Sequence, residues 1–237
     1  MTRTKDIAMT RLHAASILAG VAMLATAAPA HANLTLSQVV VDLTPDKPAR
    51  VDIEAWNDGK ERMYVLAEPA EIVDAGQPRE RRVTDPDPAA IGLLVTPRKM
   101  ILEPGERKLL RVAAVAPRAA HDRVYRVTVK PVAGEIAARD TALKILVGYD
   151  VLVLFRPDRP AATLAGERHG ASLTLVNAGN TNIELYDGRQ CDAAGKACAT
   201  LPPKRLYAGA TWTQPIDPAR GVDYRTKAGA TIGTQHF

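Results

Sequence analysis

Aromatic residues make up only 4% of this 237-residue chain, and no stretch after the N-terminal segment has 18 consecutive apolar residues. A membrane-spanning helix needs about 20 such residues, so the sequence predicts no membrane insertion. Nucleic-acid binding uses a clustered basic face with aromatic platforms. The low aromatic content and the modest net charge of +5 therefore argue against a nucleic-acid partner.

Histidines are equally sparse: after residue 32 only His121, His169 and His236 remain, far apart in the sequence. No His-Glu-x-x-His or Gly-x-Ser-x-Gly motif and no recognisable carboxylate pair occurs. A glycine-rich strand-to-helix turn that could bind phosphate is also missing. We therefore predict that the chain is not an enzyme, has no catalytic residues and uses neither a cofactor nor a metal.

The first 32 residues have the pattern of a secretory signal peptide. A basic start precedes an apolar run over residues 14–28 and the small-residue site Ala30-His31-Ala32. Cleavage is expected after Ala32. It would remove three basic residues and one acidic residue and lower the formal charge from +5 to about +3. The remaining chain is expected to be soluble and exported.

The chain has two cysteines, Cys191 and Cys198, and six residues separate them. In an oxidising compartment they are expected to form a local disulfide. The chain-entropy model gives such a short loop roughly 2.5 kcal/mol, enough to stabilise one hairpin. A redox or metal pair is the alternative, but the spacing is not Cys-x-x-Cys and no second Cys or His cluster accompanies it.

Short β-rich runs recur between turn signals from Leu34 to Phe155, and no long amphipathic helix is visible. Breakers such as Asn57-Asp58-Gly59 and Pro104-Gly105 separate the runs. This pattern is typical of an immunoglobulin-like sandwich. The fold class is thus predicted to be all-β.

A proline-rich segment, Arg156-Pro157-Asp158-Arg159-Pro160, then interrupts the pattern. Its two prolines cannot donate to a sheet ladder, so we predict a domain junction there. The predicted domains are residues 33–157, an N-terminal immunoglobulin-like domain, and residues 158–237, a smaller C-terminal β-sandwich. The second has few large apolar residues, so the disulfide and packing against the first domain should matter to its stability.

Residues 142–157, ALKILVGYDVLVLFRP, form the longest strand pattern. One face of such a strand would be apolar throughout, and the other would be mixed in its first half and apolar in its second half. The face that is apolar throughout carries Leu143, Ile145, Val147, Tyr149, Val151 and Val153. An exposed apolar edge invites pairing with another chain, so the first half is interpreted as a partner-binding edge. An ordinary buried sandwich strand is the alternative.

Three stretches give the chain a resemblance to the periplasmic chaperones of the chaperone-usher pilus pathway, the PapD-like family. They are VTPRKMILEPGE at residues 95–106, DRVYRV at residues 122–127 and LFRP at residues 154–157. Residues 177–180 extend the match loosely into the second domain. The resemblance implies two immunoglobulin-like β-sandwich domains in an L-shaped arrangement and a periplasmic location. It also implies pilus or fimbrial subunits and an outer-membrane usher as partners. The uncharged residues around the long strand also resemble those of divergent or archaic branches of the family.

The resemblance further implies that residues 142–154 are a donor strand. Leu143, Ile145, Val147 and Tyr149 would fill the groove of a subunit that lacks its own last strand. Each such side chain, fully buried, is worth about 1.5 to 3 kcal/mol before the costs of binding. The alternative is an exported immunoglobulin-like adhesive or structural module. A pilus subunit is a further alternative, which would differ from a chaperone because it would polymerise.

The family also has an interdomain ion network, which the resemblance assigns here to Asp122, Arg156 and Asp223. A guanidinium group can donate hydrogen bonds to two carboxylates at once. Members of the family bind the subunit's terminal carboxylate through two basic residues, but the corresponding positions here are Val40 and Leu152. Either Arg98 or Lys99 replaces them, or the chain belongs to a divergent branch that docks subunits differently.

Overall fold

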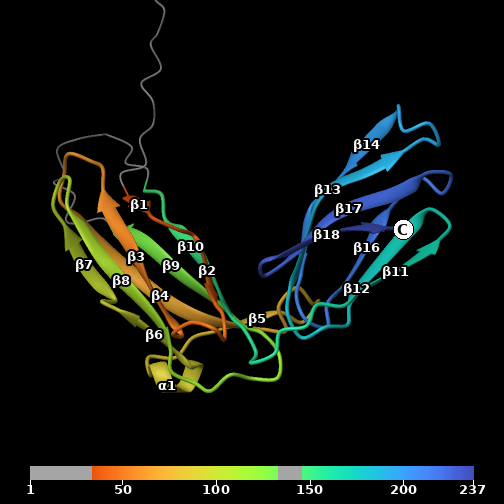
Figure 1. The fold of residues 1–237 in the computed structure, drawn as a ribbon. Coiled ribbons are helices and arrows are strands. Elements are labelled where there is room, and N and C mark those ends of the chain that lie inside the picture. The colour runs from red at the N-terminus through yellow and green to blue at the C-terminus, as the bar shows by residue number, and fades with distance from the viewer. Residues whose placement is uncertain (1–33, 133–145) are drawn as a thin grey trace, which may run out of the picture. The chain divides into compact units, whose positions relative to one another are not determined.

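The computed structural model describes residues 34–132 and 146–237. The predicted signal peptide and the predicted subunit-binding residues Leu143 and Ile145 lie outside the described residues. The described part contains strands β1 to β18 and one short helix, α1 (Pro88–Ile91) (Figure 1). No helix in these ranges is long and apolar enough to cross a membrane.

Two sheets enclose the first hydrophobic core. One sheet has the order β1 (Leu34–Leu36), β3 (Arg50–Asn57), β8 (Arg107–Ala114), β6 (Leu93–Thr96). The other has the order β2 (Val40–Leu43), β10 (Tyr149–Phe155), β9 (Arg123–Val132), β4 (Met63–Val73), β5 (Arg81–Val83), and β7 (Lys99–Leu102) also pairs with β4. Alternate residues of the strands point inward, for example Val127 and Val129 of β9, which are fully buried.

The N-terminal segment changes sheets between β1 and β2. β1 pairs antiparallel with β3, whereas β2 pairs parallel with β10 over residues 152–155. Residues 149–151 of β10 pair with β9, and within the described residues no strand pairs with them on the opposite side. The N-terminal part of β10 is therefore an open edge.

A second, smaller core lies between two further sheets. One has the order β11 (Leu164–His169), β12 (Ser172–Asn177), β16 (Thr211–Pro215). The other has the order β14 (Cys198–Leu201), β13 (Ile183–Cys191), β17 (Gly221–Ala228), β18 (Thr231–His236), and β15 (Lys204–Leu206) also pairs with β13. The two cores share no residue. A third apolar cluster packs Tyr207 against Val124, Leu152 and Leu154. A domain boundary near residue 157 stays a prediction.

Each sandwich has a buried asparagine at the end of a strand, and the two asparagines occupy equivalent positions. Asn57 ends β3, Asn177 ends β12, and both are fully buried. Each side-chain amide donates to the carbonyl groups of its own loop and of a strand across the sandwich. The pairs are Asn57 with Glu61 and Leu102, and Asn177 with Thr181 and Leu206, at 2.7 to 3.0 Å. Both Asn-x-Gly motifs are thus loop anchors that satisfy buried backbone groups.

The predicted disulfide is present. Cys191 and Cys198 face each other across the β13 and β14 hairpin, with the two sulfur atoms 2.00 Å apart. It closes one hairpin of the second sandwich, as the short spacing predicts.

Candidate functional site

β10 changes from a buried strand to an exposed segment at its N-terminal end. Val151, Val153 and Phe155 belong to the first core, whereas the side chain of Val147 is 48% exposed. Gly148 lies close to β9, because a Cβ atom there would come within 3.1 Å of the carbonyl oxygen of Val129. An open backbone edge with exposed apolar side chains is suited to pairing with another chain.

Tyr149 occupies the position where this change takes place. Its ring packs against the first core and is only partly buried. The hydroxyl donates a 2.8 Å hydrogen bond to the carbonyl oxygen of Leu34 in β1. Val147 and Tyr149 are the two predicted subunit-binding residues that the structure describes. Tyr149 is held by a hydrogen bond within the sandwich, whereas the Val147 side chain is exposed.

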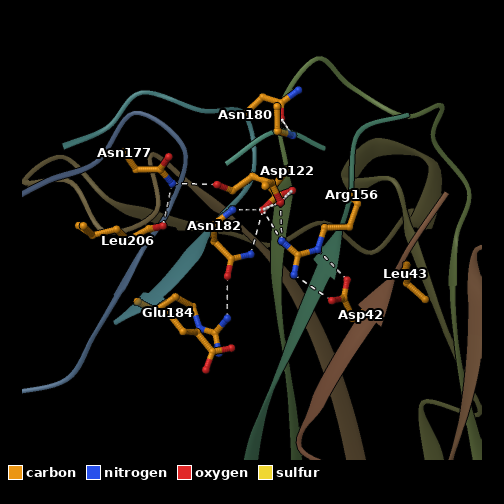
Figure 2. Close-up of polar contacts among 12 residues, drawn as sticks. Asp42, Leu43, Asp122, Arg156, Asn177, Asn180, Asn182, Glu184 and Leu206 are labelled. Carbon is orange, nitrogen blue, oxygen red and sulfur yellow. Dashed lines mark hydrogen bonds and ion pairs between the residues drawn. The ribbon is translucent and has the colours of Figure 1, made fainter. Parts of the chain in front are cut away.

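A cluster around Arg156 lies at the other end of β10 (Figure 2). The Arg156 side chain is 4% exposed, and its Nε and Nη2 donate to the two carboxylate oxygens of Asp42 at 2.6 and 2.8 Å. Its Nη1 donates to Asp122 at 3.1 Å. Burial lowers the pKa of Arg156, but the two carboxylates outweigh it and raise the pKa above its ordinary value. The guanidinium group stays charged and bridges two acids.

Asp122 connects this cluster to the loop before β13. Its side chain is 1% exposed. It accepts hydrogen bonds from the Thr181 hydroxyl at 2.9 Å and from both the backbone and side-chain nitrogens of Asn182, at 2.7 and 3.0 Å (Figure 2). The predicted pairing of Asp122 with Arg156 is thus present, and neutral groups from the second sandwich complete the acid's coordination.

The structure does not bring Asp223, the third predicted member, to this cluster. Asp223 lies on β17 directly opposite His236 of β18, and its carboxylate pairs with that imidazole at the surface. Asp42 is the second carboxylate instead. The sequence held a signal for it, because Asp42 is the only charged residue in the β-rich run over residues 34–43.

Sequence reasoning also missed Arg118. Its guanidinium group donates to the carbonyl oxygens of Leu43 at 3.0 Å, Thr44 at 2.7 Å and Arg156 at 2.7 Å. It also lies 4.7 Å from the ring centre of Phe155. Arg118 thereby joins the ends of β2 and β10. No sequence motif marks this role, since the bonds are made to backbone atoms distant in the chain.

The positions that lack the family's basic residues lie side by side. Val40, which is 45% exposed, faces Leu152 in the β2 and β10 register. Arg126 of β9 faces Leu152 from the other side. Directly opposite residues share a sheet face, so Arg126, Leu152 and Val40 lie on one face. Arg126 is therefore beside the position where the pairing of β2 with β10 begins.

A second arginine shares this face with Arg126. Arg82 Nη2 contacts the Asp150 carboxylate at 2.7 Å, and Arg126 Nη1 donates to the Asp150 carbonyl at 3.0 Å. Burial raises the pKa of Asp150, but the hydrogen bonds from Arg82 and Thr128 outweigh it and lower the pKa. Two guanidinium groups thus flank one carboxylate, leaving a positive charge in excess.

Neither predicted anchor, Arg98 or Lys99, faces Leu152, but Arg98 lines a pocket with Arg82 and Thr128. Arg98 donates to the carbonyl oxygen of Pro86 at 3.3 Å. Lys99 is exposed on β7, which is separated from β10 by β4 and β9. The structure does not bring either of them to the pair formed by Val40 and Leu152, because the β7 strand adds to the far side of β4.

Two sandwich cores and a strand that is paired on both sides over only half of its length define an all-β fold. Solved structures of fimbrial chaperones have the same fold. The class 5 fimbriae chaperone CfaA is 20% identical over 86% of this chain and 98% of that chain, with a TM-score of 0.65. The E. coli chaperone DraB is 15% identical over 86% and 96%, with a TM-score of 0.61. A chain from the complex of Salmonella enterica SafA pilin with the SafB chaperone is 16% identical over 86% and 95%, also with a TM-score of 0.61. No protein-family model and no curated protein sequence matches the chain. The predicted all-β, two-sandwich fold is confirmed.

Proposed function

We propose that this chain is a periplasmic chaperone of the PapD-like family that assembles pili. It would capture pilus subunits by donating the strand at residues 142–154 and deliver them to an outer-membrane usher. The observation that carries the proposal is the open edge of β10, where a row of apolar side chains leaves the first core and becomes exposed at Val147. The likeness in fold to a chaperone found with a pilin supports it.

The geometry of β10 supports strand donation. The inward face of residues 151, 153 and 155 fills the chain's own core, and on the same face Tyr149 is partly buried and Val147 is exposed. A partner strand on the open edge would gain backbone hydrogen bonds, and the row would fill its groove. Burial of each aliphatic side chain adds about 1.5 to 3 kcal/mol before the costs of association.

Arg126, together with Arg82, is the proposed site for the terminal carboxylate of the subunit. A partner strand that pairs along the edge must stop where Val40 begins to cover Leu152. Arg126 faces Leu152 at that point, and the excess positive charge beside Asp150 favours an anion there. Lys99 lies on β7, with β4 and β9 between it and β10, whereas Arg98 lines a pocket with Arg82 and Thr128.

The cluster of Asp42, Arg156 and Asp122 is the proposed connection between the donor strand and the second sandwich. Arg156 follows the last residue of β10 and Asp42 lies on β2, while Asp122 contacts the loop before β13. Export through a signal peptide cleaved after Ala32 would place the chain where its disulfide forms.

The test is capture of a subunit in the periplasm. The tagged chain is co-expressed with a subunit from its own pilus locus and analysed by size-exclusion chromatography. A one-to-one complex is expected, and it should be lost in an Ile145→Asp, Val147→Asp variant. Ile232→Asp is the matched control, because Ile232 is also an exposed apolar residue but lies on β18. A wild-type chain that stays monomeric with no bound subunit would favour the free-standing adhesive or structural module.

A further inference from the structure

Among the described residues, no strand pairs β1 with β10 at this side of the first sandwich. β1 is the edge of one sheet and β10 belongs to the other, because the chain changes sheets between β1 and β2. Tyr149 spans this side: its ring packs on the core and its hydroxyl reaches the carbonyl oxygen of Leu34 at 2.8 Å. One side chain thus links the edge strand of one sheet to the start of β10 in the other.

Burial along β10 places Tyr149 at a boundary. Val151, two residues later, is fully buried in the chain's own core, and Val147, two residues earlier, is 48% exposed. If Tyr149 turned out of the sandwich into a partner's apolar groove, its hydroxyl would lose the bond to Leu34. A buried hydroxyl without a partner is costly, so the conformation that the structure shows is favoured.

We propose that Tyr149 is a positioning residue and is not itself donated. It closes the first core and fixes the start of β10 against β1, so that the donated row ends at Val147. This inference rests on the proposed strand donation. A donor segment that is already held in its extended conformation has less freedom to lose on binding, so Tyr149 should act on the rate of association.

The experiment compares the wild-type chain with Tyr149→Phe, which removes only the hydroxyl. The probe is a purified subunit from the same pilus locus without its N-terminal extension, and binding is followed by stopped-flow fluorescence. The association rate constant should fall by about two- to tenfold, the equivalent of one net hydrogen bond, with the dissociation rate unchanged. Val147→Ala is the contrasting variant: it should raise the dissociation rate, because its side chain fills the groove.

Amide hydrogen exchange of the free chain gives an independent measurement. The backbone amides of β1 should exchange faster in Tyr149→Phe than in the wild type, because the bond that holds Leu34 is lost. A raised dissociation rate in Tyr149→Phe would overturn the proposal by placing the ring in the groove. Unchanged binding rates would overturn it by reducing the hydroxyl to a purely structural role. If the wild type binds no subunit, the proposed function fails. In that case, unchanged exchange of the β1 amides in Tyr149→Phe would also overturn the role of Tyr149 in fixing β10 against β1.

Discussion

Removal of the Asp122 carboxylate should destabilise the chain far more than removal of the Asp223 carboxylate. Asp122 is 1% exposed and accepts bonds from Arg156, Thr181 and Asn182. In Asp122→Asn the buried guanidinium group loses one of its two acids. Breaking a buried ion pair in this way costs about 3 to 5 kcal/mol. Because Arg156 keeps its bidentate contact to Asp42, we expect a loss at the lower end, about 3 kcal/mol.

Asp223→Asn is the matched control. Its pair with His236 is at the surface, with side chains 48% and 76% exposed, and exposed pairs contribute about 0 to 1 kcal/mol. Urea unfolding is the assay. With an m-value of about 1 to 3 kcal/mol/M, the Asp122 variant should lower the midpoint by about 1 M or more.

The two tryptophans allow each sandwich to be followed separately. Trp56 lies in β3 of the first sandwich and Trp212 in β16 of the second. In variants that keep one tryptophan, Asp122→Asn should lower the midpoint reported by either residue, since Asp122 contacts groups on both sides of the junction. Equal midpoints for the Asp122 and Asp223 variants would refute the assignment of the cluster.

Three further predictions concern binding, the loop anchors and pH. Arg126→Ala should weaken subunit binding measured by titration, whereas Lys99→Ala should leave it unchanged; the reverse result would restore an anchor predicted from sequence. Asn57→Ala and Asn177→Ala should each cost about 1 to 3 kcal/mol in urea unfolding, because buried carbonyl groups lose their donor. The pKa of Asp150 is lowered below its ordinary 3.8 in the folded chain, so the stability that it adds is complete above that pH and is lost as the pH falls below it. Asp150→Asn should flatten this part of the unfolding profile between pH 5 and about 2, and an unchanged profile would contradict the ion pair.

The features that depend on neighbouring residues could be predicted from the sequence. Alternation places Val151 and Val153 on one face, and the structure buries both. The Cys191 and Cys198 pair is close enough in the chain to meet across one hairpin. Asn57 and Asn177 end strands at turns, as their Asn-x-Gly contexts indicate. Local geometry decides all of these, since strand period and turn chemistry act over a few residues.

The composition of the candidate site was decided by tertiary structure. Asp42 and not Asp223 pairs with Arg156, because β2 runs parallel to β10 in a register that no local pattern specifies. The same register places Arg126 and Val40 on the two sides of Leu152. The sequence by itself therefore determined the strands, the disulfide and the apolar row. The pairing of strands distant in the chain decided which charges meet, because electrostatic contacts depend on distances that only the folded sheets set.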